Sequence, residues 1–319
     1  MDQSWAGPIR RSSGGSRTFT VISIALVAGL ALARRHDLVE ASEVLTTSSP
    51  VPLLVAVALS LVAVVNRAGQ FRWAHLTAGV DTDLRSMVRI SAAGYALNKV
   101  VKVGGIGGVA LFVRHGRRRG QPAGSVLAAC LINALGGHLA MVAVTIVAMI
   151  ALAISGSLPG PVALAGAAVV LGLAGTVVAI GAAGTRGRDL VERLIPIPLG
   201  LAARAANRLG RPEPPAPDPA QLDPFFETIV ALRRDPASTL PVVAHAIAAK
   251  VIGAAVLGAS LWAVGAQLAP GPVLALYVVA LVAAATTMLP GGLGAVEATM
   301  TLALTSAGVP TSTALAGTI

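Results

Sequence analysis

Charge, cysteine and aromatic side chains are scarce in this chain of 319 residues. Charged residues make up 12% of it, about half the share in ordinary globular domains, which excludes a soluble domain of useful size. The single cysteine, Cys130, excludes an intrachain disulfide and a cysteine-based metal cluster. Aromatic residues are only 3% of the chain, too few for a stacking surface, and we expect no nucleic-acid partner.

Apolar residues, in contrast, make up 55% of the chain. Several uninterrupted apolar runs reach the roughly 20 residues that a helix needs to span a bilayer. The net charge of +10 comes mostly from arginines in short loops, as the positive-inside rule predicts for cytoplasmic loops. We therefore predict an all-α polytopic protein of the cell (inner or plasma) membrane, with a cytoplasmic N-terminus.

Basic residues flank one glycine-rich apolar segment on both sides. Arg85 and Arg89 precede Ile90–Val113, and Arg114–Arg119 follow it. If both flanks are cytoplasmic, the segment begins and ends on one side of the membrane. We therefore predict a re-entrant helical hairpin over about 87–113.

A second glycine-rich stretch resembles the first. Val103–Ala110 matches Pro290–Glu297 at the glycines, the branched apolar residue and the valine. Hydrophobic segments broken by glycine at corresponding places in two halves point to a transporter's binding site. We predict inverted repeats, with a second hairpin at about 273–307 whose helices run over about 273–289 and 295–306; a full crossing at this place is the alternative. The hairpin breaks are Gly104, Gly105, Gly107, Pro290, Gly291, Gly292 and Gly294.

The whole chain, 1–319, is predicted to be one integral membrane domain. Its first half, 18–183, contains apolar helices at about 18–35, 51–70, 123–154 and 162–183. A cytoplasmic linker with an amphipathic helix follows at 184–237, and the second half, 238–319, begins with a helix at about 238–267. The first helix imitates a signal peptide, but we favour an uncleaved span. The chain stops inside what looks like the start of another helix, which indicates either a truncated C-terminus or a very short last element.

Ionisable residues inside a membrane are costly and therefore candidates for function. The three lysines of the chain, Lys99, Lys102 and Lys250, all have apolar neighbours, and Glu297 is the only acid in the apolar region of the second repeat. This excess of positive charge suits an anion such as a lipid phosphate. Snorkelling of Lys99 and Lys102, or a structural Lys250–Glu297 pair, is the plainer interpretation. His245 and Asn98 complete the predicted substrate-binding set.

The segment Leu289–Ala298, continued by Ala307–Pro310 and Ala314–Ala316, resembles the C-terminal signature of the lysylphosphatidylglycerol synthase transmembrane (flippase-like) family. Asn98–Arg119 is similar to that family's first glycine-containing hairpin and basic loop. The resemblance implies translocation of a phospholipid or polyprenyl-linked lipid between leaflets. The aminoacyl-transferase domain of the namesake enzymes is absent from this sequence, so lysyl transfer is not implied.

Three functions stay open. The first is a flippase-like transporter of an anionic phospholipid or a polyprenyl-phosphate-linked lipid, which is not an enzyme. The second is a membrane glycosyltransferase that uses a polyprenyl-phosphate donor, with Asp37, Glu40 and Glu43 as its acids. The third is a non-catalytic partner of a separately encoded lipid-modifying enzyme. Neither glycine cluster is followed by the Lys-Ser/Thr pair of a nucleotide-binding loop, and we expect no cofactor and no metal.

Overall fold

The computed structural model describes residues 46, 48–100, 106–154, 164, 166–176, 178, 223–286, 295–306 and 308–318. Within these residues the regular structure is entirely helical, without a strand. The main helices are α3 (Pro50–Thr77), α4 (Leu84–Val100), α5 (Ile106–Arg117), α6 (Ala123–Ile154), α9 (Asp223–Arg234), α10 (Leu240–Ala263), α11 (Pro270–Thr286), α12 (Ala295–Ser306) and α13 (Thr311–Thr318). An apolar helix, Gly166–Thr176, and a 3₁₀ turn, Pro236–Thr239, complete them.

Three helices are long and apolar enough to cross a membrane: α3, α6 and α10 with its preceding turn. Their 28, 32 and 24 residues correspond to about 42, 48 and 36 Å, against a hydrocarbon core of about 30 Å. Both α3 and α10 have proline in the first turn, where no N–H is needed. Each is followed by a glycine with positive φ, Gly79 and Gly265, which ends the helix. The prediction of an all-α membrane protein is confirmed.

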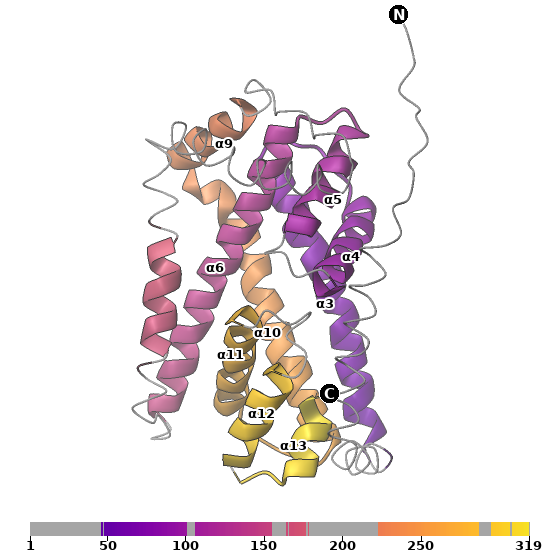
Figure 1. Cartoon of the computed structure of the whole chain (residues 1–319), viewed down its shortest axis with the longest axis vertical. Coiled ribbons are helices and arrows are strands. Elements are labelled where there is room, and N and C mark those ends of the chain that lie inside the picture. Colours follow the sequence, from indigo (N-terminus) through magenta and orange to yellow (C-terminus); the bar gives the residue numbers. More distant parts are fainter. Residues whose placement is uncertain are drawn as a thin grey trace, which may run out of the picture.

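Helices α3 and α10 pack antiparallel along the long axis of the molecule (Figure 1). At one end the N–H of Ser49 donates to the carbonyl of Ala263 at 2.9 Å. At the other end Thr77 Oγ1 donates to the carbonyl of Ser238 at 3.2 Å. Helix α6 packs against both of them. Gly136 allows this close approach, since a Cβ there would lie 2.9 Å from Val242 Cγ1, as is typical of small residues between membrane helices.

The shorter helices form two hairpins that open at opposite ends of this bundle (Figure 1). Helices α4 and α5 pack together, and Asp83 before α4 pairs with Arg119 after α5; this hairpin starts beside the end of α3. Helices α11 and α12 also pack together and start beside the end of α10. The glycine breaks at 101–105 and 287–294 lie outside the described residues. Re-entrance into a membrane and a two-fold relation of the hairpins stay predictions.

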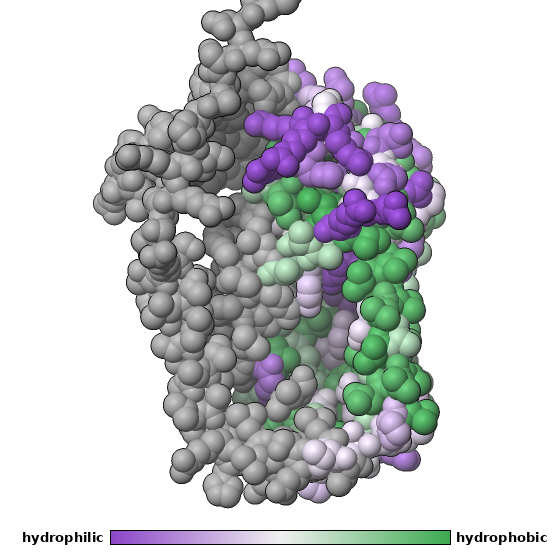
Figure 2. All heavy atoms as spheres, turned by 90° about the vertical axis from the view of Figure 1, so that its right-hand side faces the viewer, coloured by the Kyte–Doolittle hydropathy of each residue, from purple (hydrophilic) through white to green (hydrophobic). Residues whose placement is uncertain are grey.

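The outer surface of the bundle separates into an apolar column and a polar end. Large apolar side chains of α3 are exposed: Val51, Leu53, Leu54, Val55, Val57, Leu61, Val62, Val64 and Val65. Figure 2 shows a green apolar surface that ends below a purple hydrophilic cap. Exposed arginines of α4 and α5, among them Arg85, Arg89, Arg114, Arg117 and Arg118, lie at the open end of the first hairpin. Such a surface fits a lipid-facing belt with a charged end in the headgroup layer.

The predicted elements agree with the structure in most of the described parts. The bounds of α6 and α12 coincide with the predicted ones. Helix α3 runs seven residues beyond the predicted end, because its polar residues find partners: Arg72 Nε donates to the Thr82 carbonyl and His75 Nδ1 to the Phe71 carbonyl. The first predicted helix, 18–35, and most of the 184–237 linker lie outside the described residues.

Candidate functional site

A cavity of about 570 Å³ lies between α3, α6, α10, α11 and the helix at 166–176. Most of its wall is apolar, as expected inside a membrane bundle. Its polar lining residues come from four helices: Arg67, Gln70, Asn133, His138, Thr176 and Lys250. No aspartate or glutamate is among the described residues that line it. The described wall therefore carries positive charge without an opposing carboxylate.

The two cations of this cavity lie beside the contact between α3 and α10, and we call this contact the α3–α10 seam. Asn66 Nδ2 donates to the carbonyl of His245 at 2.8 Å, which fixes the orientation of the Asn66 amide. Its Oδ1 therefore faces His245 Nδ1 at 2.8 Å, so Nδ1 carries the proton. The imidazole lies on Gly69, where a Cβ would stand 2.7 Å from His245 Cε1. Arg67 follows Asn66 directly, and Lys250 lies a little more than one turn beyond His245.

Both cations lie near the middle of the bundle's height, although Arg67 is exposed and Lys250 is half-buried. Lys250 is about 15 Å beyond the start of α10, and Arg67 is about 15 Å before the end of α3. These two helix ends lie together, joined by Thr77 and Ser238, so the cations occupy similar depths near the middle of a 30 Å core. One charge at that depth costs about 2.5–3.5 kcal/mol on insertion scales. Their mutual repulsion adds to this cost, which an anion in the cavity would offset.

Each hairpin supplies a tyrosine beside these cations. The guanidinium of Arg67 lies 4.9 Å from the ring centroid of Tyr95 in α4. This cation–π contact stabilises the positive charge, and the neutral ring does not cancel it. Tyr277 of α11 packs its hydroxyl on Gly253 of α10 and is close enough to interact with the charge of Arg67. The first helix of each hairpin thus contacts the region around the cationic pair.

Helix α6 forms the opposite wall. Gln70 Nε2 donates to the backbone carbonyl of Asn133 at 3.4 Å and so joins α3 to α6 beside the cavity. Asn133 Oδ1 is buried and accepts no hydrogen bond from the described residues. His138 Nδ1 lies 2.7 Å from the carbonyl of Ala134; because a carbonyl only accepts, Nδ1 carries a proton.

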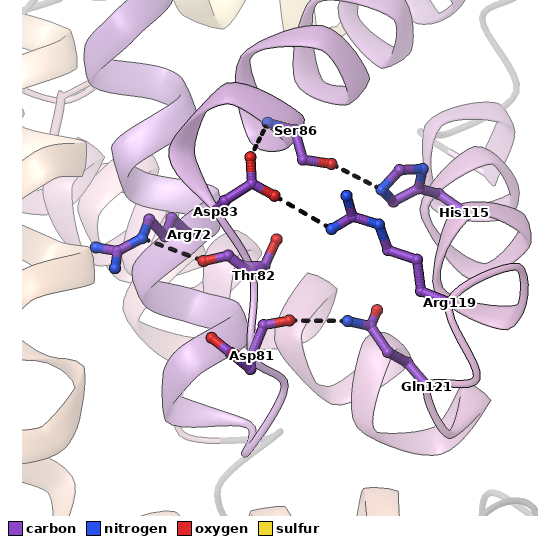
Figure 3. A network of polar contacts seen from close by, with 8 residues as sticks. All are labelled: Arg72, Asp81, Thr82, Asp83, Ser86, His115, Arg119 and Gln121. Atoms are coloured by element: carbon purple, nitrogen blue, oxygen red, sulfur yellow. Dashed lines mark hydrogen bonds and ion pairs between the residues drawn. The ribbon is translucent and has the colours of Figure 1, made fainter.

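A second polar cluster ties the two ends of the first hairpin together, and we call it the hairpin base (Figure 3). Asp83 caps α4 by accepting the Ser86 N–H at 2.8 Å and accepts from Arg119 at 3.2 Å. The Ser86 hydroxyl lies 3.0 Å from His115 Nε2, and Gln121 Nε2 donates to the Asp81 carbonyl at 2.9 Å. Arg72 links this cluster to α3 through the Thr82 carbonyl.

Two groups of the hairpin base have shifted pKa values. The Ser86 N–H, together with Arg119, holds the pKa of the Asp83 carboxyl below its usual value, because both stabilise the carboxylate. Partial burial lowers the pKa of His115, and the positive charge of Arg119 adds to this shift. At neutral pH the cluster therefore consists of an ionised Asp83 and a neutral His115.

The structure brings only part of the predicted site together. Lys250 lines the cavity, and His245 supports it from the α3–α10 seam. Glu297 lies half-buried in the first turn of α12 and is not among the described residues of the cavity wall. Asn98 and Lys99 lie in the last turn of α4, and Gly107 lies in the first turn of α5. The side chains of Asn98 and Lys99, and all of Lys102, Gly104, Gly105, Pro290, Gly291, Gly292 and Gly294, lie outside the described residues.

Comparison with known families gives a match over nearly the whole chain. The family described as Lysylphosphatidylglycerol synthase TM region matches residues 19–319. The chain belongs to this family. It is thus a membrane protein of a lipid-related family, as its C-terminal signature indicated. Comparison with curated proteins gave no match.

Sequence reasoning missed Arg67 and Asn133 as members of the site. Arg67 lies close to the predicted end of its helix, at residue 70, and no role was predicted for it, although ten more residues of α3 follow it. A signal was present: the apolar residues of α3 continue past Arg67, and Asn66 next to it is a second polar residue in the same turn. Asn133 carries no such signal. An asparagine inside an apolar helix is more simply explained by a hydrogen bond between helices, and nothing in the neighbouring sequence indicates a cavity.

Proposed function

We propose that this protein moves an anionic lipid between the two leaflets of the cell membrane without covalent chemistry. One observation supports this most: two cations, Arg67 and Lys250, line a deep cavity whose described wall contains no carboxylate. A phosphate is the anion that a membrane offers at high concentration. The compact ammonium of Lys250 and the planar fork of Arg67 complement each other as phosphate ligands.

The geometry also supports a pathway for the headgroup. The cavity lies at mid-depth, and the two hairpins open toward opposite ends of the bundle (Figure 1). Tyrosines from both hairpins contact the cationic region, so movement of either hairpin would change access to it. In this proposal the acyl chains stay in the surrounding lipid, next to the exposed apolar face of α3, while the phosphate passes the two cations.

The test is a translocation assay with the full chain in proteoliposomes that contain a fluorescent anionic phospholipid. Chemical bleaching of the outer leaflet measures the rate of exchange. We expect Lys250→Ala and Arg67→Gln each to reduce this rate about tenfold or more, because a charge-assisted hydrogen bond contributes about 1.5–3 kcal/mol. The matched control is Arg118→Gln, which removes one positive charge from the exposed hairpin base. Equal rates for all three variants and the parent protein would refute the proposal.

A further inference from the structure

We infer that Tyr95 of the first hairpin is a positioning residue that competes with the anion for Arg67. Without an anion, the ring of Tyr95 holds the guanidinium against α4. When an anion enters the cavity, the guanidinium turns to it and leaves the ring, and the contact between α3 and α4 weakens. This inference rests on the proposed function and describes how binding at that site is linked to the first hairpin.

Arg67 stands between two surroundings. Its side chain lines the cavity that also contains Lys250, and its guanidinium lies 4.9 Å from the ring centroid of Tyr95. Tyr95 is not among the residues that line the cavity, so a guanidinium over its ring lies at the edge of the cavity. Arg67 is exposed and Tyr95 is 48% exposed, and packing therefore encloses neither side chain. The guanidinium has room to change its partner.

The two partners of Arg67 differ in strength. A cation–π contact is weaker than the charge-assisted hydrogen bonds that an anion accepts from a guanidinium. The charge of Lys250 repels that of Arg67, and an anion between them removes this repulsion. The described cavity wall contains no carboxylate that would take the place of the anion. The ring is therefore the better partner in the empty cavity, and the anion in the occupied one.

The second hairpin supplies a less exposed tyrosine to the same region. Tyr277 of α11 packs its hydroxyl against Gly253 of α10 and is half-buried. It is close enough to Arg67 and to Tyr95 to interact electrostatically with both. Because Tyr95 is the more exposed of the two, a movement of its hairpin can withdraw its ring while Tyr277 keeps its place on α10.

Competition determines the sign of the effect. Loss of the Tyr95 ring leaves Arg67 available to the anion for more of the time, so the affinity for the anion rises. A tyrosine that binds the anion through its hydroxyl would lower the affinity when it is removed. A tyrosine that only packs would leave the affinity unchanged in a folded variant. Loss of a cation–π contact at an exposed site predicts an affinity about three- to sixfold higher.

The experiment measures binding of dihexanoyl phosphatidylglycerol, a short-chain anionic lipid, to the purified full chain in detergent by calorimetry. We expect Tyr95→Leu to bind it about three- to sixfold more tightly than the parent protein, and Tyr95→Phe, which keeps the ring, to bind like the parent. In an Arg67→Gln background Tyr95→Leu should have no effect. The matched control is Trp73→Leu: Arg72 lies 6.0 Å from the Trp73 ring centroid, neither residue lines the cavity, and the affinity should not change.

A graded change of the ring tests the same competition in a variant that keeps its shape. Phenylalanine with one, two or three fluorines at position 95 has a progressively less negative ring face, and the affinity for the lipid should rise with each fluorine. Spin labels at positions 65 and 92, both exposed, report the distance between α3 and α4 in a Cys130→Ala background. The lipid should broaden this distance distribution in the parent protein and leave it unchanged in Arg67→Gln.

The outcomes distinguish this inference from the proposed function. An unchanged or lower affinity in Tyr95→Leu, or an affinity that does not depend on the number of fluorines, would overturn the competition and leave the cationic site intact. Affinities that do not change in Arg67→Gln or Lys250→Ala would refute the cationic site itself, and the proposed function with it.

Discussion

Asn66 connects α3 to α10 with both ends of its side-chain amide. It donates to the His245 carbonyl and accepts from His245 Nδ1, each at 2.8 Å. Because Arg67 is its chain neighbour and Lys250 follows on α10, this pair sets the spacing of the cavity's two cations. In a membrane such interhelical hydrogen bonds contribute about 0.6 kcal/mol on average and up to about 1.7 kcal/mol.

We predict a coupling energy of about 1 kcal/mol between Asn66 and His245. A double-mutant cycle with Asn66→Leu and His245→Leu, measured by reversible unfolding in mixed micelles, checks it. The cycle of Asn66→Leu with His138→Leu is the control, since His138 bonds only within its own helix among the described residues. A coupling near zero for the first cycle would show that the bond between the two side chains does not stabilise the seam; the bond to the backbone carbonyl of residue 245 is present with either side chain there.

Gly69 is the residue on which the His245 ring lies. A Cβ at this position would stand 2.7 Å from Cε1 of that ring, so Gly69→Ala must displace the imidazole and strain its bonds to Asn66. We expect a lower melting temperature and slower lipid exchange. Gly175→Ala is the matched control: it also lies in a helix, nothing lies within 4 Å of its added Cβ, and the substitution should stabilise by about 0.5–1 kcal/mol. Equal effects of the two substitutions would contradict this account.

At the scale of elements, the hairpin base decides how firmly α4 and α5 are held together. Two of its members, Asp83 and His115, have shifted pKa values; the other charged or titratable groups in or near the base are Asp81, Arg72, Arg118, Arg119 and His75. The pKa of His115 is lowered while α4 and α5 are held together at the hairpin base. As pH falls below about 6.5, the imidazole therefore takes up a proton more readily when the two helices are apart. Stability of the closed base is then lost with acidification. Asp83 acts in the same direction, but only at lower pH, because its pKa is lowered from an already acidic value.

We therefore predict that the hairpin base loosens between about pH 7.5 and about pH 5.5. Spin labels at positions 85 and 118, which are both exposed, report this as a broader distance distribution at the lower pH. The variant His115→Gln, whose amide can still bond to Ser86, should remove the change in this interval. A distribution that broadens equally in His115→Gln would assign the transition to another group.

Elements differ in how far the sequence determined them. Helices α6 and α12 were predicted with their bounds because proline or glycine comes directly before each of them and glycine follows each within two residues. The start of α4 was placed too late, at about residue 87, although Asp83 is a common N-cap residue and does cap this helix. That Arg67 and Lys250 lie in one cavity was not predictable. Their proximity depends on the packing of α3 against α10, and a single sequence does not show which helices pack together.

For the whole molecule, the two ends of the bundle should face opposite sides of the membrane. Arg118 lies at the end of the first hairpin and Gln267 follows α10 at the other end (Figure 1); both are exposed. In a Cys130→Ala background we predict that Arg118→Cys reacts with an impermeant reagent only from the cytoplasmic side, and Gln267→Cys only from outside. Arg85→Cys should behave like Arg118→Cys. Reaction of the cysteines at positions 85 and 118 from opposite sides would contradict the re-entrant hairpin.

The Asn66–His245 connection also constrains the order in which the molecule is made. The two residues are 179 positions apart, and ribosomes add about 5–20 residues per second. Helix α3 therefore waits about 10–35 s in the nascent chain before α10 exists, with Arg67 next to an unbonded Asn66. During that interval the insertion machinery or another helix must shelter the cation. Completion of the lipid site is thus a late step in biogenesis, and the seam between α3 and α10 is the place where slow or failed assembly would first become visible.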